Sequence, residues 1–154
     1  MSRWIAAFIL SLAGMGCSPA GPCEAGPSAS IELGTGVDDF EEVPDPPTWE
    51  LVYGAQGGVH LDVSVRARGL DANAPWRVAV TGVLDGAIRA SNRETVPSPT
   101  CTGSAAEVSG LRLIFDDDVR PADLRVPLDL SAVVADGEGT TVEDIREGVI
   151  IDGV

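Results

Sequence analysis

The chain has 154 residues, enough for one domain with a hydrophobic core, and 44% of them are apolar, too many for a disordered chain of this size. The formal net charge of −14 argues against nucleic acid as a partner, because nucleic-acid phosphates require a basic face. All ten basic residues are arginine, which we interpret as a bias of genomic base composition, because the sequence contains no cluster of arginines.

Residues 1–16 have the organisation of an export signal. Arg3 lies in a short N-terminal region, an apolar run follows over 4–13, and small residues precede Cys17. Ten apolar positions are too few to span a bilayer. The sequence therefore predicts a signal peptide that is removed after export.

The junction before Cys17 resembles the lipobox of bacterial lipoproteins, although Gly14 stands where that family usually has leucine and Met15 is also unusual. The resemblance implies cleavage before Cys17, which would carry the lipid and anchor the protein to the membrane. Ser18 is the type of residue that usually sends such lipoproteins to the outer membrane, so we expect a cell-envelope location. An ordinary secretory signal cut nearby, with Cys17 incidental, is the alternative.

Residues 17–29 are rich in proline, glycine and serine, the composition of a flexible tether between an anchor and a folded domain over 30–154. With Cys17 lipidated, Cys23 and Cys101 remain, an even number of cysteines in an oxidising compartment. We expect a disulfide between them, and two free thiols are the alternative. A metal pair or a catalytic cysteine is disfavoured because the single histidine is distant in sequence and no C-x-x-C occurs.

Short runs of alternating apolar and polar residues, separated by turn residues, fill the rest of the chain, and no long segment has a helical period. The pattern predicts an all-β domain, an immunoglobulin-like β-sandwich of about seven to nine strands. The cysteine spacing does not match the inter-sheet bridge of antibody domains, so this likeness is architectural. The expected strands are 30–33, 49–53, 59–68, 76–84, 87–95, 107–115, 124–134 and 140–151, the last with a single helical turn as its alternative.

The hairpin over 51–70 has the clearest pattern, with a glycine-rich turn before a strand of unbroken alternation. One face should be buried and the other wet, and the wet face comprises His60, Asp62, Ser64, Arg66 and Arg68. The pattern Gly-x-Gln-Gly-Gly-x-His, with an arginine six positions later, resembles uncharacterised predicted lipoproteins of myxobacteria and related bacteria, and it implies no activity. Two further features are an Asp85–Gly86 hairpin turn and an acidic, proline-rich loop after Gly36, with Phe40 as its inward anchor.

Three side chains on that wet face have the residue types of a catalytic triad: His60, Asp62 and Ser64. They lie on one strand at steps of roughly 6.5 Å, which is too stretched for a triad, and no G-x-S-x-G occurs. We therefore expect His60 to contact a neighbouring strand or loop and to help fix the turn. A binding surface around Gln56 and His60 is the second interpretation of the same residues.

Acidic residues at turns do not match a calcium-binding loop, and we interpret them as solvated carboxylates, with no metal and no cofactor bound. They are Asp38, Asp39, Asp116, Asp117, Asp118, Asp136 and Glu138. The sequence as a whole favours a non-catalytic, lipid-anchored envelope protein that acts as a structural or protein-interaction module. The alternative is a sandwich that binds calcium or a saccharide at the loops of one end.

Overall fold

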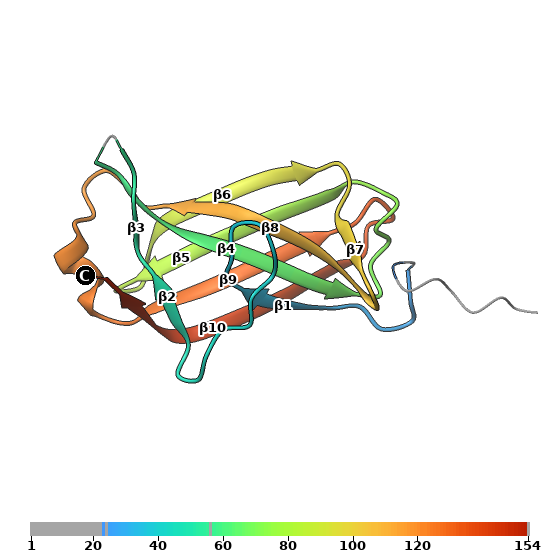
Figure 1. The fold of residues 1–154 in the computed structure, drawn as a ribbon, viewed down its shortest axis with the longest axis horizontal. Helices are drawn as coiled ribbons and strands as arrows, with labels where there is room; N and C mark the ends of the chain where they lie inside the picture. The colour runs from blue at the N-terminus through green and yellow to red at the C-terminus, as the bar shows by residue number, and fades with distance from the viewer. Residues whose placement is uncertain (1–22, 24, 56, 154) are drawn as a thin grey trace, which may run out of the picture.

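Two β-sheets pack face to face in the computed structural model, which describes residues 23, 25–55 and 57–153 (Figure 1). The all-β sandwich expected from the alternating pattern is confirmed. The strands in chain order are β1 (Ser30–Gly34), β2 (Thr48–Glu50), β3 (Val52–Tyr53), β4 (Val59–Arg68), β5 (Trp76–Leu84), β6 (Ala87–Val96), β7 (Thr100–Thr102), β8 (Ala105–Ile114), β9 (Leu128–Ala135) and β10 (Thr141–Asp152).

The first sheet has the order β1-β4-β8-β7, with β3 also paired to β4, and the second has the order β2-β10-β9-β5-β6. All neighbours are antiparallel except β2 and β10, which run parallel. The expected strand over 49–53 is divided, because β2 joins the second sheet and β3 the first. This segment therefore crosses from one layer of the sandwich to the other.

Inward residues of the two sheets form one core, as strict alternation in β4 predicts. Every inward position of β4 from Val59 to Ala67 is buried. In β8 the alternation breaks at a bulge, where Ser109 and Gly110 lie between the paired residues Val108 and Leu111. Gly110 has a φ of +69°, which glycine adopts without the strain that a side chain would cause.

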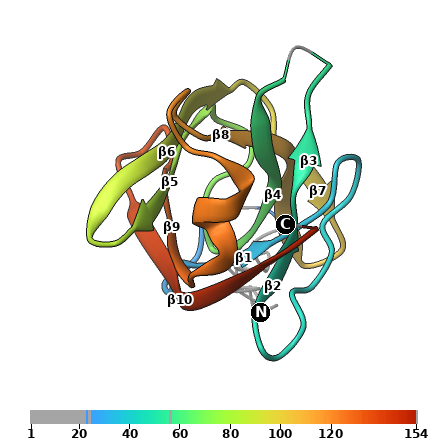
Figure 2. The same cartoon turned by 90° about the vertical axis from the view of Figure 1, so that its left-hand side faces the viewer.

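The expected Asp85–Gly86 turn and the terminal strand agree with the structure, and the start of one strand was wrong. Asp85 and Gly86 both have positive φ, as a two-residue hairpin turn requires, and β10 is a strand. The strand expected from Leu124 begins instead at Leu128, because a short 3-10 helix, η1 (Pro121–Arg125), precedes it. This helix crosses one open end of the sandwich (Figure 2), and its Leu124 side chain is buried.

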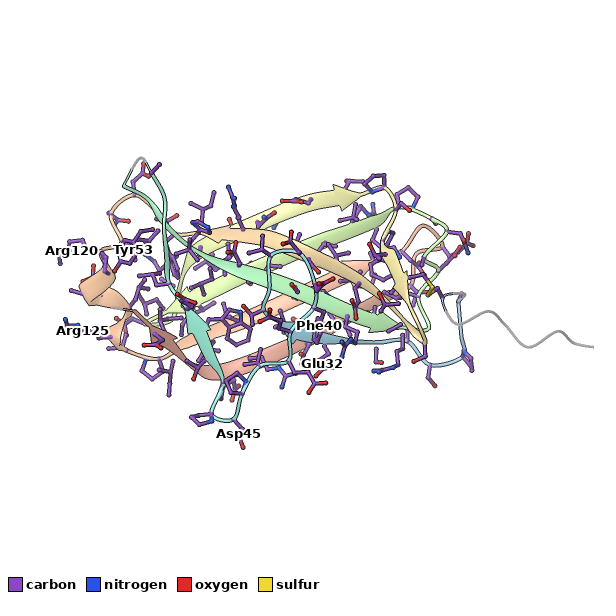
Figure 3. The ribbon with its side chains drawn as sticks, viewed as in Figure 1. Glu32, Phe40, Asp45, Tyr53, Arg120 and Arg125 are labelled. Carbon is purple, nitrogen blue, oxygen red and sulfur yellow. A yellow bond between two sulfur atoms is a disulfide. The ribbon has the colours of Figure 1, made fainter. Side chains whose placement is uncertain are left out.

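The loop between β1 and β2 covers the outer face of the first sheet, so the face expected to be wet is partly enclosed. Ser64 is fully buried and donates a hydrogen bond of 2.8 Å to the carbonyl oxygen of Gly36. Phe40 anchors the loop as expected, but on the outer face: the guanidinium carbon of Arg66 lies 4.0 Å from its ring centroid (Figure 3). Arg66 also pairs with Glu107, at 2.8 Å. The expectation of an exposed Ser64 was therefore wrong.

The expected disulfide is present between Cys23 and Cys101, whose Cα atoms are 6.0 Å apart. It ties the start of the described chain to β7, and the carbonyl oxygen of Cys23 accepts a hydrogen bond from the backbone N–H of Ala72, at 3.1 Å. The expectations for the signal peptide, for Cys17 and for residues 18–22 lie outside the described residues. Among the described residues, no helix has the length and apolar character needed to cross a bilayer.

Candidate functional site

The strand directions gather the connections at two opposite ends of the sandwich (Figures 1 and 2). We call one the tether end, because the Cys23–Cys101 disulfide lies there. We call the other the hairpin end, which is formed by the β3–β4 turn, the Asp85–Gly86 turn and residues 115–127. Because β3 and β4 are consecutive antiparallel strands, the glycine-rich turn necessarily projects at the hairpin end.

Several large apolar side chains are exposed at the hairpin end. Among the described residues, seven large apolar side chains are exposed, and four of them belong to segments at this end, with exposed fractions from 42% to 63%. These four are Tyr53, Ile88, Ile114 and Val126. They do not form one patch, because Tyr53 pairs with the inward Val59 whereas Ile114 pairs with His60 on the outer face. Ile114 is the one that borders the glycine-rich turn on the outer face, beside a hollow.

Two hollows flank the glycine-rich turn. The first, which we call the His60 hollow, has a volume of about 400 Å³ and is lined by Gly54, Ala55, Gly58, Val59, His60, Arg112 and Ile114. The second, of about 320 Å³, shares Gly58, Val59 and Ile114 and extends over the segment from Phe115 to Pro121. Apart from the glycine itself and its chain neighbours, no described residue has an atom within 4 Å of where a Cβ on Gly57 or Gly58 would stand, so this part of the turn is open.

His60 lies beside Asp62 of its own strand, between β3 and β8. Its Nε2 lies 3.6 Å from Oδ1 of Asp62, and the two side chains are 13% and 15% exposed. Across the sheet, His60 lies directly opposite Ile114 of β8 on one side and Val52 of β3 on the other. The hydroxyl of Ser64 donates to Gly36, so these three side chains are not arranged as a triad. Gln56, the other residue expected to bind, lies outside the described residues.

Ion pairs hold the loop over 115–127 against the β5–β6 hairpin. Arg89 pairs with Asp118 at 2.6 Å and with Asp116 at 3.7 Å. The hydrogen bond from Arg89 to Asp118, together with the attraction between their charges, raises the pKa of the guanidinium. In η1, the backbone N–H of Arg120 donates to the carboxylate of Asp123, at 2.9 Å, and this bond and the Arg120 side chain lower the pKa of Asp123.

Asp136, interpreted from the sequence as solvated, is instead 2% exposed. Its Oδ1 accepts backbone hydrogen bonds from Glu138 and Thr140, at 3.0 and 2.9 Å, and its Oδ2 accepts one from Asp71, at 3.3 Å. The carboxylate thus organises the β9–β10 turn and joins it to the β4–β5 loop. Within the described part of the chain, no group of three or more histidine, cysteine or acidic side chains could hold a metal ion.

The sequence-based reasoning missed Arg112 and Ile114 as residues of the hairpin end. The signal was present: Leu111, Leu113 and Phe115 are the inward residues, so an isoleucine at the outward position between the last two is out of pattern. Comparisons with known proteins add no candidate residues, because no known family matches the sequence and no curated protein matches it. The candidate site therefore depends on the geometry of the hairpin end.

Proposed function

We propose that this protein is an exported, lipid-anchored, non-catalytic module of the cell envelope that binds a protein partner through its hairpin end. The lipid on Cys17 would attach it to the outer membrane, and the part of the 17–29 segment that precedes the Cys23–Cys101 disulfide would serve as the tether. The immunoglobulin-like arrangement belongs to this proposal as the scaffold that presents loops at one end. The module needs no cofactor for such a role.

One observation carries the proposal: Ile114 is exposed at the rim of the His60 hollow, at the end of the sandwich opposite the Cys23–Cys101 disulfide. A tether that leaves the sandwich near this disulfide would direct the hairpin end away from the membrane surface. Protein interfaces combine apolar residues at their centre with a polar rim. Ile114, which borders the His60 hollow beside the glycine-rich turn, would form such a centre, and His60 and Arg112 would belong to its polar rim.

Site-specific photo-crosslinking in intact cells tests the proposal. A photoreactive residue would replace Ile114 at the hairpin end or, as a matched control, Ile145 in the middle of β10. These positions are 57% and 53% exposed, so they differ in location rather than in accessibility. We expect a discrete crosslinked species from position 114 that Ala55→Asp, a charge introduced in the same hollow, weakens at least about tenfold, the effect of about 1.4 kcal/mol. Equal crosslinking from position 145, or none from position 114, would contradict the assignment.

The anchor is tested separately by the intact mass of the native protein from the membrane fraction. We expect a chain that begins at Cys17 and carries added acyl mass. A soluble, unmodified chain cut elsewhere would refute the anchor, and it would leave the crosslinking result to decide the binding role of a secreted protein.

A further inference from the structure

Outside the hairpin end, the outer face of the second sheet carries a hollow of about 370 Å³ over β5, β6 and β9. It is lined by Arg77, Val78, Ala79, Arg93, Glu94, Thr95, Val133 and Ala135. It lies toward the tether end of the sheet, since β5 begins and β9 ends there. No residue of this hollow takes part in the function proposed above.

Sheet register places two arginines beside each other in this hollow. Arg77 lies opposite Thr95, and Arg93 lies opposite Ala79, so the arginines are diagonal neighbours on one face of the β5–β6 pair. Diagonal neighbours are about 7–8 Å apart, within reach of one another for long side chains. Two guanidinium groups can therefore approach the same small anion.

Both arginines lack a carboxylate partner within 4.0 Å among the described residues, in a chain with 24 acidic residues. Glu94 lines the hollow, but its Oε1 accepts a hydrogen bond of 3.0 Å from Nδ2 of Asn92. Glu143, on β10, is in the same row of the sheet as Arg93, but Val133 and Ala79 lie between the two residues in the strand register. The two positive charges are therefore free to pair with an anion from solution.

Beside the arginines, the hollow has a floor of small apolar side chains. Val133 lies opposite Ala79, and Ala135 lies opposite Arg77, on the same outer face. Guanidinium groups bind carboxylate and phosphate through paired hydrogen bonds. An alkyl group that covers the alanine and valine side chains removes apolar surface from water, which favours binding. We propose that this hollow binds an amphiphilic anion, with its carboxylate or phosphate between Arg77 and Arg93 and its alkyl body on the floor.

Calorimetric titration of the whole protein tests this with three probes: octyl phosphate below its micelle concentration, inorganic phosphate and 1-octanol. We expect octyl phosphate to bind more tightly than either of the others, because each of them supplies only half of the interaction. Nonanoate carries an octyl chain on a carboxylate. Comparing its affinity with that of octyl phosphate then distinguishes a fatty acid from a phosphate ester as the source of the anion.

Arg77→Gln and Arg93→Gln should each weaken octyl phosphate binding about tenfold or more, the effect of one charged hydrogen-bonding group. Arg68→Gln is the matched control, because Arg68 also lacks an ion pair among the described residues and lies on β4 outside this hollow. Equal binding of inorganic phosphate or of 1-octanol, equal loss in Arg68→Gln, or no binding of octyl phosphate at millimolar concentration would each overturn the proposal. The unfolding midpoint of each variant shows that the fold is retained.

Discussion

Two buried tryptophans provide a matched test of how polar groups are satisfied in this core. Trp49 and Trp76 are 1% and 0% exposed. Nε1 of Trp76 donates a hydrogen bond of 2.7 Å to the carbonyl oxygen of Asp71, whereas Nε1 of Trp49 is buried with no partner among the described residues. The same substitution at the two positions therefore removes the same atoms, but it breaks a hydrogen bond at Trp76 and removes an unpaired donor at Trp49.

Trp76→Phe leaves the Asp71 carbonyl without its donor, and Trp49→Phe removes an N–H that is already unpaired. The cavity contributions are similar because both side chains are fully buried and lose the same volume. An unpaired buried polar group costs about 1–3 kcal/mol, so we expect Trp76→Phe to lose about 2 kcal/mol more than Trp49→Phe in the free energy of unfolding. For a domain of this size, that corresponds to roughly 6–10 °C in the unfolding midpoint.

Urea unfolding followed by far-UV circular dichroism measures both free energies, with unchanged m-values as the check that each variant folds alike. Trp49→Phe should fall within about 1.5 kcal/mol of the native protein, as a tolerated change of core shape does. If the two variants lost the same free energy, or if Trp49→Phe lost more, the hydrogen bond of Trp76 would not be a significant source of stability and the reasoning would be refuted.

Four other predictions concern the loops and the crosslink. Reduction of the Cys23–Cys101 disulfide, which spans 78 residues, should lower the free energy of unfolding by up to roughly 4–5 kcal/mol, and an unchanged midpoint in dithiothreitol would contradict this. Asp136→Ala should destabilise the protein by about 3 kcal/mol because three backbone donors lose their acceptor, whereas Asp136→Asn should lose less; similar losses in denaturant titrations would mean that the acceptor atoms do not matter. Because the pKa of Asp123 is lowered in the folded state, its contribution is present above the unfolded value of about 3.9 and is lost as the pH falls through the folded value. Asp123→Asn should therefore be less stable than the native protein at pH 7, with a difference that narrows below about pH 4, and a difference independent of pH would count against the Arg120 interaction. Finally, millimolar Ca²⁺ or EDTA should leave the unfolding midpoint unchanged, and a rise with Ca²⁺ alone would revive the calcium-binding alternative.

Much of the fold could be predicted from the sequence because strand patterns and tight turns are local. Successive residues of a strand point to opposite faces, so the buried face of β4 follows from its own residues, and Asp85–Gly86 needs only its own backbone conformation. The Cys23–Cys101 pairing followed from the count of cysteines once Cys17 was assigned to the lipid. The start of β9 was misjudged because Leu124 and Val126 continue the alternation, although they belong to η1 and its exit.

The candidate sites depend on contacts between residues far apart in sequence, and these could not be predicted. Ser64 was expected to be exposed on the wet face of a strand, but the loop between β1 and β2 covers it. Asp136 was expected to be exposed in a turn, but its carboxylate is buried and accepts hydrogen bonds from three backbone N–H groups. Arginines showed no clustering in the sequence, yet Arg77 and Arg93 are neighbours because β5 and β6 pair in one register. By itself the sequence determined which face of each strand is apolar and where most of the turns lie, since these are properties of consecutive residues. Only the tertiary structure decided which strands meet and which side chains share a surface, because that depends on packing two complete sheets around one core.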